Sequence, residues 1–389
     1  MKSVNCDVLV VGASPSGIAA ATSSAKAGAE VILLDKDMGG SFGHPANTFF
    51  DGMFRRAGLA VEREYVLHDL EGMRIISPAG HAVEIPAAGR FIDRGRFDAL
   101  YLDRAEGAGV ELLRGVARSA PLADSGRRVE TDAGEIGARV VIDASGVDGA
   151  IARKEGLSPL KHPEDVAWAA EAVVELAGLG EERRFEYFLG SISPGWKATF
   201  SPGGGDLATL GVFVRGHGRD VRPFLDRFVE FFKGYKSADY DVSDMKIVSV
   251  NRGGDAIATL PGEIVADSLM ATGAAAGMSG IAYAIRAGTM AGEVAAGAAA
   301  AGDVSIRGLS PYVRRWRREF GLEYRMGRAS LLTLGRMPEE EIDRLAAGLA
   351  KRDLDLSGSF FRKGLSAGTA LARARPRTIP SLVRSFVEG

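Results

Sequence analysis

The chain has 389 residues, of which 46% are hydrophobic and 25% are charged, and its formal net charge is −2. A globular protein of this length buries a large core, and we expect two or three structural units. The single cysteine, Cys6, excludes an intramolecular disulfide, and no Cys or His cluster has metal-ligand spacing, so no metal site is expected. No apolar run approaches the roughly 18 residues of a membrane span, and the first motif leaves no room for a signal peptide. The sequence therefore predicts a cytoplasmic protein.

Charge is distributed unevenly along the chain. Residues 305–389 contain 17 Lys and Arg against 9 Asp and Glu, whereas the first 304 residues contain 31 against 41. A basic C-terminal part on an acidic body suggests a surface that meets anions, such as phospholipid or isoprenoid phosphate head groups at the inner membrane face. Arginines on solvated helix faces would give the same count. No recognition module accompanies the charge, so nucleic acid is not an expected partner.

The first predicted element is a βαβ unit at residues 7–36. An apolar strand leads into the turn Gly12-Ala13-Ser14-Pro15-Ser16-Gly17, a small-residue helix and a second strand that ends in Asp35. Gly12 permits the sharp turn, and Gly17 lets the helix pack closely on the sheet. The middle position, where backbone normally approaches a pyrophosphate, is Ser14 instead of glycine. Helix N–H groups can face phosphates and Asp35 can bond ribose hydroxyls, so the unit predicts a dinucleotide site; an ordinary glycine turn is the alternative.

The elements that follow are predicted in chain order. Residues 73–76 and 82–85 predict a hairpin, and Arg94 opens a helix that runs to Ala108. Further predicted elements are strands at 110–113, 128–132 and 139–142, alternating strands with one helix at 221–233 between 157 and 255, a buried strand at 269–272, a small-residue helix from 281 toward 300, and Arg- and Leu-rich C-terminal helices.

The predicted nucleotide-binding sheet is discontinuous, because its last strand and helix come about 260 residues after the first. Flavoproteins with an inserted substrate domain divide in this way. We expect an α/β fold, with a split Rossmann-like FAD-binding domain, an inserted antiparallel-sheet substrate domain and a helical C-terminal part. The expected ranges are 1–60, 90–155 and 256–303 for the FAD domain, 61–89 and 156–255 for the substrate domain, and 304–389 for the C-terminal domain.

Four segments resemble the FAD-dependent geranylgeranyl reductases, a family within the fold shared with aromatic hydroxylases. They are the 7–36 unit, the Asp-Arg-x-x-Phe-Asp helix start at 93–98, the strand Pro194-Gly195-Trp196-Lys197-Ala198-Thr199-Phe200-Ser201-Pro202, and the segment 309–343. The third is similar to the family's Pro-Gly-Gly-Tyr-x-Trp-x-Phe-Pro strand, which lines the substrate cavity. The fourth discriminates best against hydroxylases.

The resemblance implies FAD as the cofactor, with Arg94 against it, and the N-terminus of the helix at Ile281 beside the flavin O2 side. The residues expected to bind the cofactor are Gly12, Ala13, Ser14, Pro15, Ser16, Gly17, Asp35, Lys36, Pro45, Ala46, Arg94, Ala117, Gly146, Gly273, Ala274, Gly277, Gly280 and Ile281.

The chain also departs from the family pattern. Ala274 replaces an aspartate that meets the cofactor, and His44-Pro45-Ala46 stands where the family has Arg-Cys-Gly. Either FAD binds through a modified set of contacts, or the site is retuned for another substrate, or the chain no longer binds the cofactor.

The implied reaction is reduction of isoprenoid C=C bonds by reduced FAD, on geranylgeranyl chains of lipids, quinones or prenyl phosphates. An isolated alkene has no carbonyl to polarise, so the protein must position it and exclude water. The substrate contacts expected are Trp196, Phe200 and Tyr283, with Phe49, Phe50 and Phe213 as further lining; each could equally be ordinary core. His44 is the candidate proton donor, with a cofactor contact or a surface position as the alternative.

No second glycine fingerprint is present, so the electron donor is either transiently bound NADPH or a ferredoxin-like protein. Two other hypotheses stay open. One is a flavin monooxygenase or halogenase acting on a small substrate, although the halogenase Trp-x-Trp-x-Ile-Pro strand is missing. The other is a non-catalytic lipid-binding protein that kept the fold.

Overall fold

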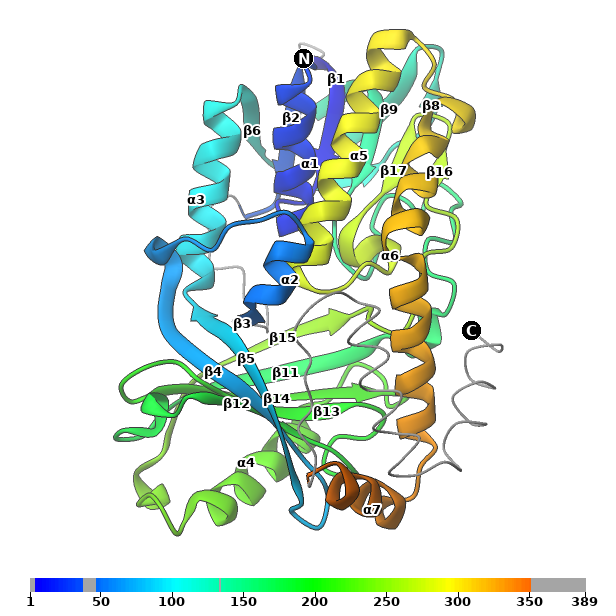
Figure 1. Ribbon diagram of the computed structural model, residues 1–389. Helices are drawn as coiled ribbons and strands as arrows, with labels where there is room; N and C mark the ends of the chain where they lie inside the picture. Colours follow the sequence, from blue (N-terminus) through cyan, green and yellow to red (C-terminus); the bar gives the residue numbers. More distant parts are fainter. Residues whose placement is uncertain (1–3, 38–46, 133, 351–389) are drawn as a thin grey trace.

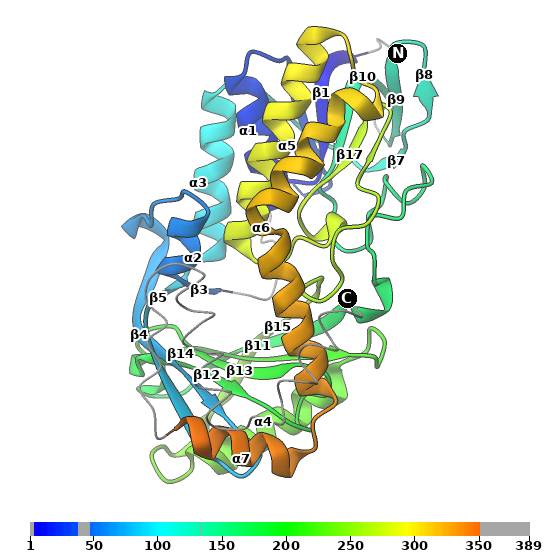
Figure 2. The ribbon, with the colours of Figure 1, turned by 45° about the vertical axis from the view of Figure 1, so that its right-hand side comes forward.

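The computed structural model describes residues 4–37, 47–132 and 134–350. Two sheets form separate layers, and helices α1, α3 and α5 cover the first while α4 covers the far face of the second (Figure 1). The long helix α6 runs beside both sheets, and α7 lies near the second sheet (Figure 2). The helices are α1 (Pro15–Lys26), α2 (Asp51–Arg56), α3 (Arg94–Gly107), α4 (Arg222–Lys236), α5 (Ile281–Ala301), α6 (Ile306–Gly335) and α7 (Glu339–Leu349).

The first sheet has the order β16-β17-β10-β1-β2-β6, with β7, β8 and β9 attached beside β10. Its central pairs, from β17 through β6, are parallel, and strands β2 and β17 are apolar runs because both of their faces are buried. Its strands are β1 (Val4–Val11), β2 (Val31–Asp35), β6 (Val110–Arg114), β7 (Ala117–Ser119), β8 (Leu122–Ala123), β9 (Gly126–Thr131), β10 (Gly134–Asp143), β16 (Val265–Ala266) and β17 (Leu269–Ala271).

Segments distant in sequence meet in this sheet, as the sequence predicts. In β17, Met270 lies opposite Ile142 of β10, which in turn pairs with Val10 of β1. On one face α1 and α5 pack backbone to backbone: a Cβ on Gly288 would lie 2.0 Å from the Ser16 carbonyl oxygen. The small residues of both helices are therefore required by their close approach.

The second sheet has the order β15-β11-β14-β13-β12-β4-β5-β3, and most of its pairs are antiparallel. The predicted hairpin is confirmed, and it is longer than the pattern indicates. The strands are β3 (Thr48–Phe50), β4 (Val66–Ile76), β5 (Ala82–Ile92), β11 (Ala167–Glu175), β12 (Arg184–Phe188), β13 (Lys197–Pro202), β14 (Leu207–Arg215) and β15 (Lys246–Asp255).

Alternation gives the second sheet two distinct faces. The face covered by α4, called here the α4 face, carries Phe188, Ala198, Phe200, Leu210 and Val212 in one buried cluster with helix residues. The opposite face, called the cavity face, looks toward the N-terminus of α5 (Figure 1). Each strand therefore contributes to a core on one side and to an open space on the other.

Helix α6 joins the two layers with an aromatic stripe. Tyr312, Trp316, Phe320 and Tyr324 recur every four residues and are buried against the first layer. Across the described part of the chain, no helix is both long and apolar enough to span a membrane.

Candidate active site

The glycine turn after β1 is packed as its sequence predicts. Gly12 has φ +104°, and a Cβ there would lie 2.6 Å from the Ala144 carbonyl oxygen. A Cβ on Gly17 would lie 1.9 Å from the Gly12 carbonyl oxygen, so α1 could not start so close to the strand. Both positions need glycine for close approach.

Ser14 has a structural role that glycine cannot supply. Its hydroxyl donates to the Ala144 carbonyl at 3.0 Å and accepts from the Gly17 N–H at 3.3 Å, so it caps α1 and joins the turn to the end of β10. The departure from glycine thus strengthens the turn. The N-terminus of α1, which is the positive end of its dipole, lies at the edge of the sheet where the parallel strands end.

Asp35 ends β2 beside this turn. Its Oδ2 accepts from the Ala13 N–H at 2.7 Å and its Oδ1 from the Asp37 N–H at 2.8 Å. The carboxylate is fixed in orientation and retains lone pairs for ribose hydroxyls. Lys36, Ala117 and Gly146 follow the carboxyl ends of β2, β6 and β10. This edge of the sheet fits a dinucleotide, with two helix N-termini and an oriented carboxylate.

The segment after β17 closes the same edge. Gly273 has φ +62°, and a Cβ there would lie 2.1 Å from the Ser16 hydroxyl. Ala274 offers no carboxylate, but α6 holds the segment: Tyr312 donates to the Thr272 hydroxyl at 3.1 Å, and Tyr324 donates to the Ser279 carbonyl at 2.8 Å. Helix α6 therefore fixes the start of α5.

Arg94 lies at the first residue of α3 and is 9% exposed. Its Nη2 lies 3.3 Å from Asp98 Oδ2, and burial raises the pKa of the Asp98 carboxyl above its ordinary value. A contact between Arg94 and the flavin stays a prediction.

A cavity of about 180 Å³ lies between the N-terminus of α5 and the cavity face of the second sheet. Phe49, Phe50, Phe185, Trp196 and Phe213 give it an aromatic wall. The other lining residues used below are polar: Glu171, Tyr187, Lys197, Thr199, Ser201, Asp255 and Ser279.

Asp255 is the carboxyl next to the start of α5. It accepts a hydrogen bond from the Ser279 hydroxyl and another from the Ile257 N–H at 3.0 Å. Burial raises the pKa of Asp255 above its ordinary value, although these hydrogen bonds and the Lys197 charge oppose the shift. A carboxyl with a raised pKa can hold a proton inside the cavity.

A second cavity, of about 500 Å³, lies under the junction of α6 and α7. It shares Tyr187 and Trp196 with the first cavity. Its wall is mostly apolar and includes Ile75, Leu189, Leu331, Leu334, Met337 and Ile342.

Residues 7–167 match the family model for FAD dependent oxidoreductases. The chain is 33% identical over 366 residues to digeranylgeranylglycerophospholipid reductase 1 of Methanothermobacter thermautotrophicus, and the match covers 87% of this chain and 89% of that protein. The chain belongs to the geranylgeranyl reductase family of FAD-dependent oxidoreductases. It is also 29% identical to digeranylgeranylglycerophospholipid reductase 2 of Methanosphaera stadtmanae, with coverage of 90% and 93%.

Solved structures show the same fold. A geranylgeranyl bacteriochlorophyll reductase-like protein from Thermoplasma acidophilum matches with a TM-score of 0.87 at 21% identity, covering 99% of this chain and 100% of that one. A flavin-dependent brominase matches with a TM-score of 0.67 at 18% identity, covering 96% and 100%. The split FAD fold expected from the sequence is confirmed.

Two of the expected substrate contacts of this reductase-family chain lie elsewhere. Phe200 is fully buried on the α4 face, with its ring centroid 5.0 Å from that of Phe232, so the prediction that it lines the cavity is wrong. Alternation places Lys197, Thr199 and Ser201 on the cavity face instead. Tyr283 packs between α5 and α6, where its hydroxyl donates to Glu323, and it does not line the described cavity.

Some of the other predicted site residues line the cavity, and some lie outside the described residues. Trp196, Phe49, Phe50 and Phe213 line the cavity, as do Gly280 and Ile281. His44, Pro45 and Ala46 lie outside the described residues. Sequence reasoning missed Lys197 and Asp255; the single signal for Lys197 was a charged residue in an otherwise uncharged strand.

The possible ligand atoms of His162, Glu164 and Asp165 lie within 4.8 Å of one another, a spacing that could hold a metal ion. Asp165, however, accepts hydrogen bonds from both Arg215 and Arg328. Burial would raise the pKa of Asp165, but these two arginines lower it below its ordinary value. The cluster therefore ties α6 to the second sheet.

Proposed function

We propose that this FAD-dependent oxidoreductase reduces isoprenoid C=C bonds of geranylgeranyl lipids. The observation that carries the proposal is the cavity at the N-terminus of α5, which has an aromatic wall and shares Tyr187 and Trp196 with a larger, mostly apolar cavity. A geranylgeranyl chain is long and apolar, and the named relatives are digeranylgeranylglycerophospholipid reductases. An apolar passage beside a flavin site suits such a chain.

The cofactor would be held by the edge of the first sheet. Asp35 would bind the ribose, the N–H groups at the start of α1 the pyrophosphate, and the N-terminus of α5 the flavin ring. When bound, reduced FAD supplies a hydride to one alkene carbon.

The cavity residues would do the rest. The aromatic wall, including Phe49 and Phe213, would exclude water and position the alkene. Asp255, whose pKa is raised by burial, would hold the proton that the second alkene carbon receives. The electrons would come from transiently bound NADPH or a ferredoxin-like protein.

We further propose a discontinuous FAD domain at about 1–60, 90–155 and 256–303, with β3 contributing to the substrate sheet. The basic residues of the C-terminal part would bring the protein to the inner face of the membrane, where lipid substrates lie.

The test is anaerobic mixing of the flavin-loaded, dithionite-reduced protein with geranylgeranyl lipids. We expect the flavin to be reoxidised and the lipid to gain two mass units per reduced bond. If the flavin is reoxidised only by oxygen with an aromatic substrate, the protein is a monooxygenase. A protein that cannot be loaded with FAD would contradict the proposal and favour a non-catalytic lipid-binding protein.

A further inference from the structure

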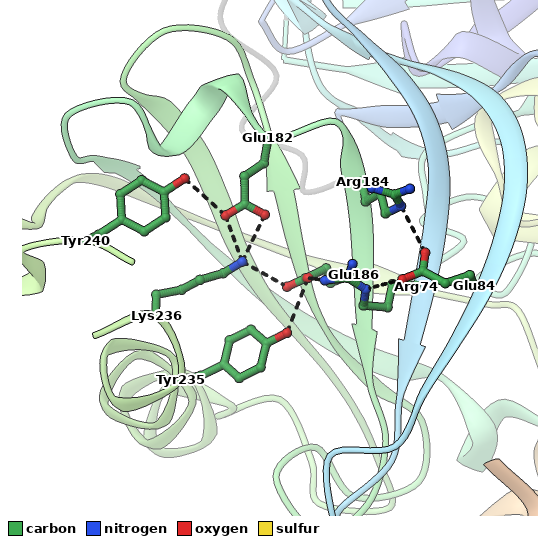
Figure 3. Close-up of polar contacts among 8 residues, drawn as sticks. All are labelled: Arg74, Glu84, Glu182, Arg184, Glu186, Tyr235, Lys236 and Tyr240. Atoms are coloured by element: carbon green, nitrogen blue, oxygen red, sulfur yellow. Dashed lines mark hydrogen bonds and ion pairs between the residues drawn. The ribbon is translucent and has the colours of Figure 1, made fainter. Parts of the chain in front are cut away.

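Two buried lysines lie on opposite faces of the second sheet, and their surroundings differ. Lys236, on the α4 side, is 5% exposed; its Nζ lies 2.8 and 2.9 Å from the two Glu182 oxygens and 3.5 Å from Glu186 Oε2. Figure 3 shows this ammonium between the two carboxylates, which Arg74, Tyr235 and Tyr240 also contact. Its charge is neutralised within the fold.

Lys197, on the cavity face, is 8% exposed and has no carboxylate oxygen within 4 Å among the described residues. Its Nζ lies 4.4, 4.3 and 4.6 Å from the ring centroids of Tyr187, Trp196 and Phe213. Its one hydrogen bond within the described structure goes to the Tyr187 hydroxyl, at 3.1 Å. The rings stabilise the cation, but an ammonium has three N–H donors.

A buried ammonium that forms no ion pair costs several kcal/mol. Burial raises the pKa of Asp255, which lines the same cavity, and the Lys197 charge opposes that rise, but the two groups form no ion pair among the described residues. A ligand oxygen would therefore complete the hydrogen bonding of Lys197. Lys197 lines the cavity at the N-terminus of α5, and the Thr199 and Ser201 side chains line it from the same strand. The donors of Lys197 that Tyr187 does not take are therefore available to a molecule in this cavity.

We propose that Lys197 binds a hydrogen-bond-accepting oxygen of the substrate, carried close to the double bond that is reduced. The oxygen belongs either to a phosphate or to a carbonyl group. The assignment of the ligand as an alkene rests on the proposed function; the oxygen site rests on Lys197 itself.

The cavity under α6 and α7 indicates how the substrate would be oriented. Trp196 and Tyr187, which contact Lys197, also border the apolar cavity under α6 and α7. The oxygen would lie at Lys197, and the apolar chain would pass these two rings toward Leu331 and Ile342.

Binding to the oxidised, flavin-loaded protein tests the proposal without turnover. Three probes share one ten-carbon skeleton: geranyl diphosphate, geranial and the hydrocarbon 2,6-dimethylocta-2,6-diene. Equilibrium dialysis gives each Kd for the natural protein, for Lys197→Met, and for Lys233→Met as a control lysine that lies on α4, outside the cavity. A lost charged hydrogen bond predicts a 10- to 100-fold weaker Kd for one oxygenated probe in Lys197→Met alone, with the hydrocarbon within about 2-fold. Which probe weakens identifies phosphate or carbonyl.

Unchanged affinity for both oxygenated probes in Lys197→Met, or an equal loss for the hydrocarbon, would overturn the proposal. If Lys197→Met does not fold, Tyr187→Phe replaces it. That variant frees one more ammonium donor and keeps the ring, so the affected probe should bind at least as tightly as before, and a 10-fold loss would count against the proposal. Reduction of geranylgeranyl lipids with no effect of Lys197 would reject the oxygen site alone; oxygen binding without reduction would reject the proposed reaction alone.

Discussion

The two faces of the second sheet are built from the same strands but have different roles. In β12, Glu186 turns toward α4 and meets Lys236 and Arg74, while the next residue, Tyr187, turns toward the cavity. In β13, Phe200 is core, and Thr199 beside it lines the cavity. On the α4 face each buried charge has a partner within the fold, whereas Lys197 on the cavity face has aromatic rings and a single hydroxyl. The difference indicates which face is built for stability and which for a ligand.

The sharpest test of the α4 face is Lys236→Met. It leaves Glu182 and Glu186 buried without their ammonium, and removing one partner of a buried ion pair costs about 3–5 kcal/mol. We expect this loss in the free energy of unfolding from urea denaturation. Lys197→Met should leave that free energy unchanged or raise it by up to several kcal/mol, because it removes a buried ammonium that forms no ion pair. Equal losses in the two variants would remove the contrast between the faces.

Adjacent residues of β13 give a second contrast. Phe200→Ala opens a hole against Phe232 and should cost about 3 kcal/mol, again measured by urea denaturation. Thr199→Val keeps the side-chain size on the cavity face but removes a hydroxyl, and it should cost about 1 kcal/mol. A larger loss for Thr199→Val than for Phe200→Ala would show that the faces are assigned the wrong way round.

Arg94 extends the comparison to the first sheet, where this buried cation lies beside Asp98. We expect Arg94→Ala to weaken FAD binding about 10-fold, since a charge-assisted contact to the cofactor is lost. The measurement is flavin release on dilution, followed by fluorescence. Asp98→Asn is the control, because it keeps the guanidinium and should retain the flavin. Unchanged FAD affinity in Arg94→Ala would remove this residue from the cofactor site.

The smallest expected effect concerns the pH dependence of Asp255. Burial raises the pKa of this carboxyl in the folded state, so the folded protein binds the proton more tightly than the unfolded chain. That contribution to stability is present at low pH and is lost as the pH rises through the folded-state pKa. Relative to Asp255→Asn, the natural protein should therefore lose stability as the pH rises above about 4. Urea denaturation of both proteins across about pH 3–9 measures the difference, and curves that stay parallel over this whole range would contradict the shift.

The sequence predicted the central strands of the first sheet, because their signals are local, but it missed the short strands β7, β8 and β16. Gly12, Gly17 and Asp35 act within one βαβ unit, and the apolar run Leu269–Ala271 predicts a buried strand. The cavity face was harder to predict. One residue of register decides whether Phe200 or Thr199 faces the cavity, and aromatic character alone favoured the wrong choice.

Long-range contacts explain the other misses. The sequence predicts that Tyr283 lines the cavity, but in the structure it packs against Glu323 and Phe320 of α6. Ala274 lacks the carboxylate of the family pattern, and its effect on FAD binding stays a prediction; the structure shows that Tyr312 and Tyr324 hold this segment from α6. These hydrogen bonds have no signal in the local sequence, because the partners are 40 to 45 residues apart in the chain.

The most direct measurement compares Lys197→Met with Lys236→Met as flavin-loaded proteins under conditions where both are folded. The rate at which a geranylgeranyl lipid reoxidises the reduced flavin is followed anaerobically. The account predicts that Lys197→Met reacts at least about 10-fold more slowly than the natural protein, while Lys236→Met reacts within about 2-fold of it. A Lys197→Met protein that reacts at the natural rate, or a Lys236→Met protein that is equally slowed, would contradict the assignment of the cavity face to the substrate.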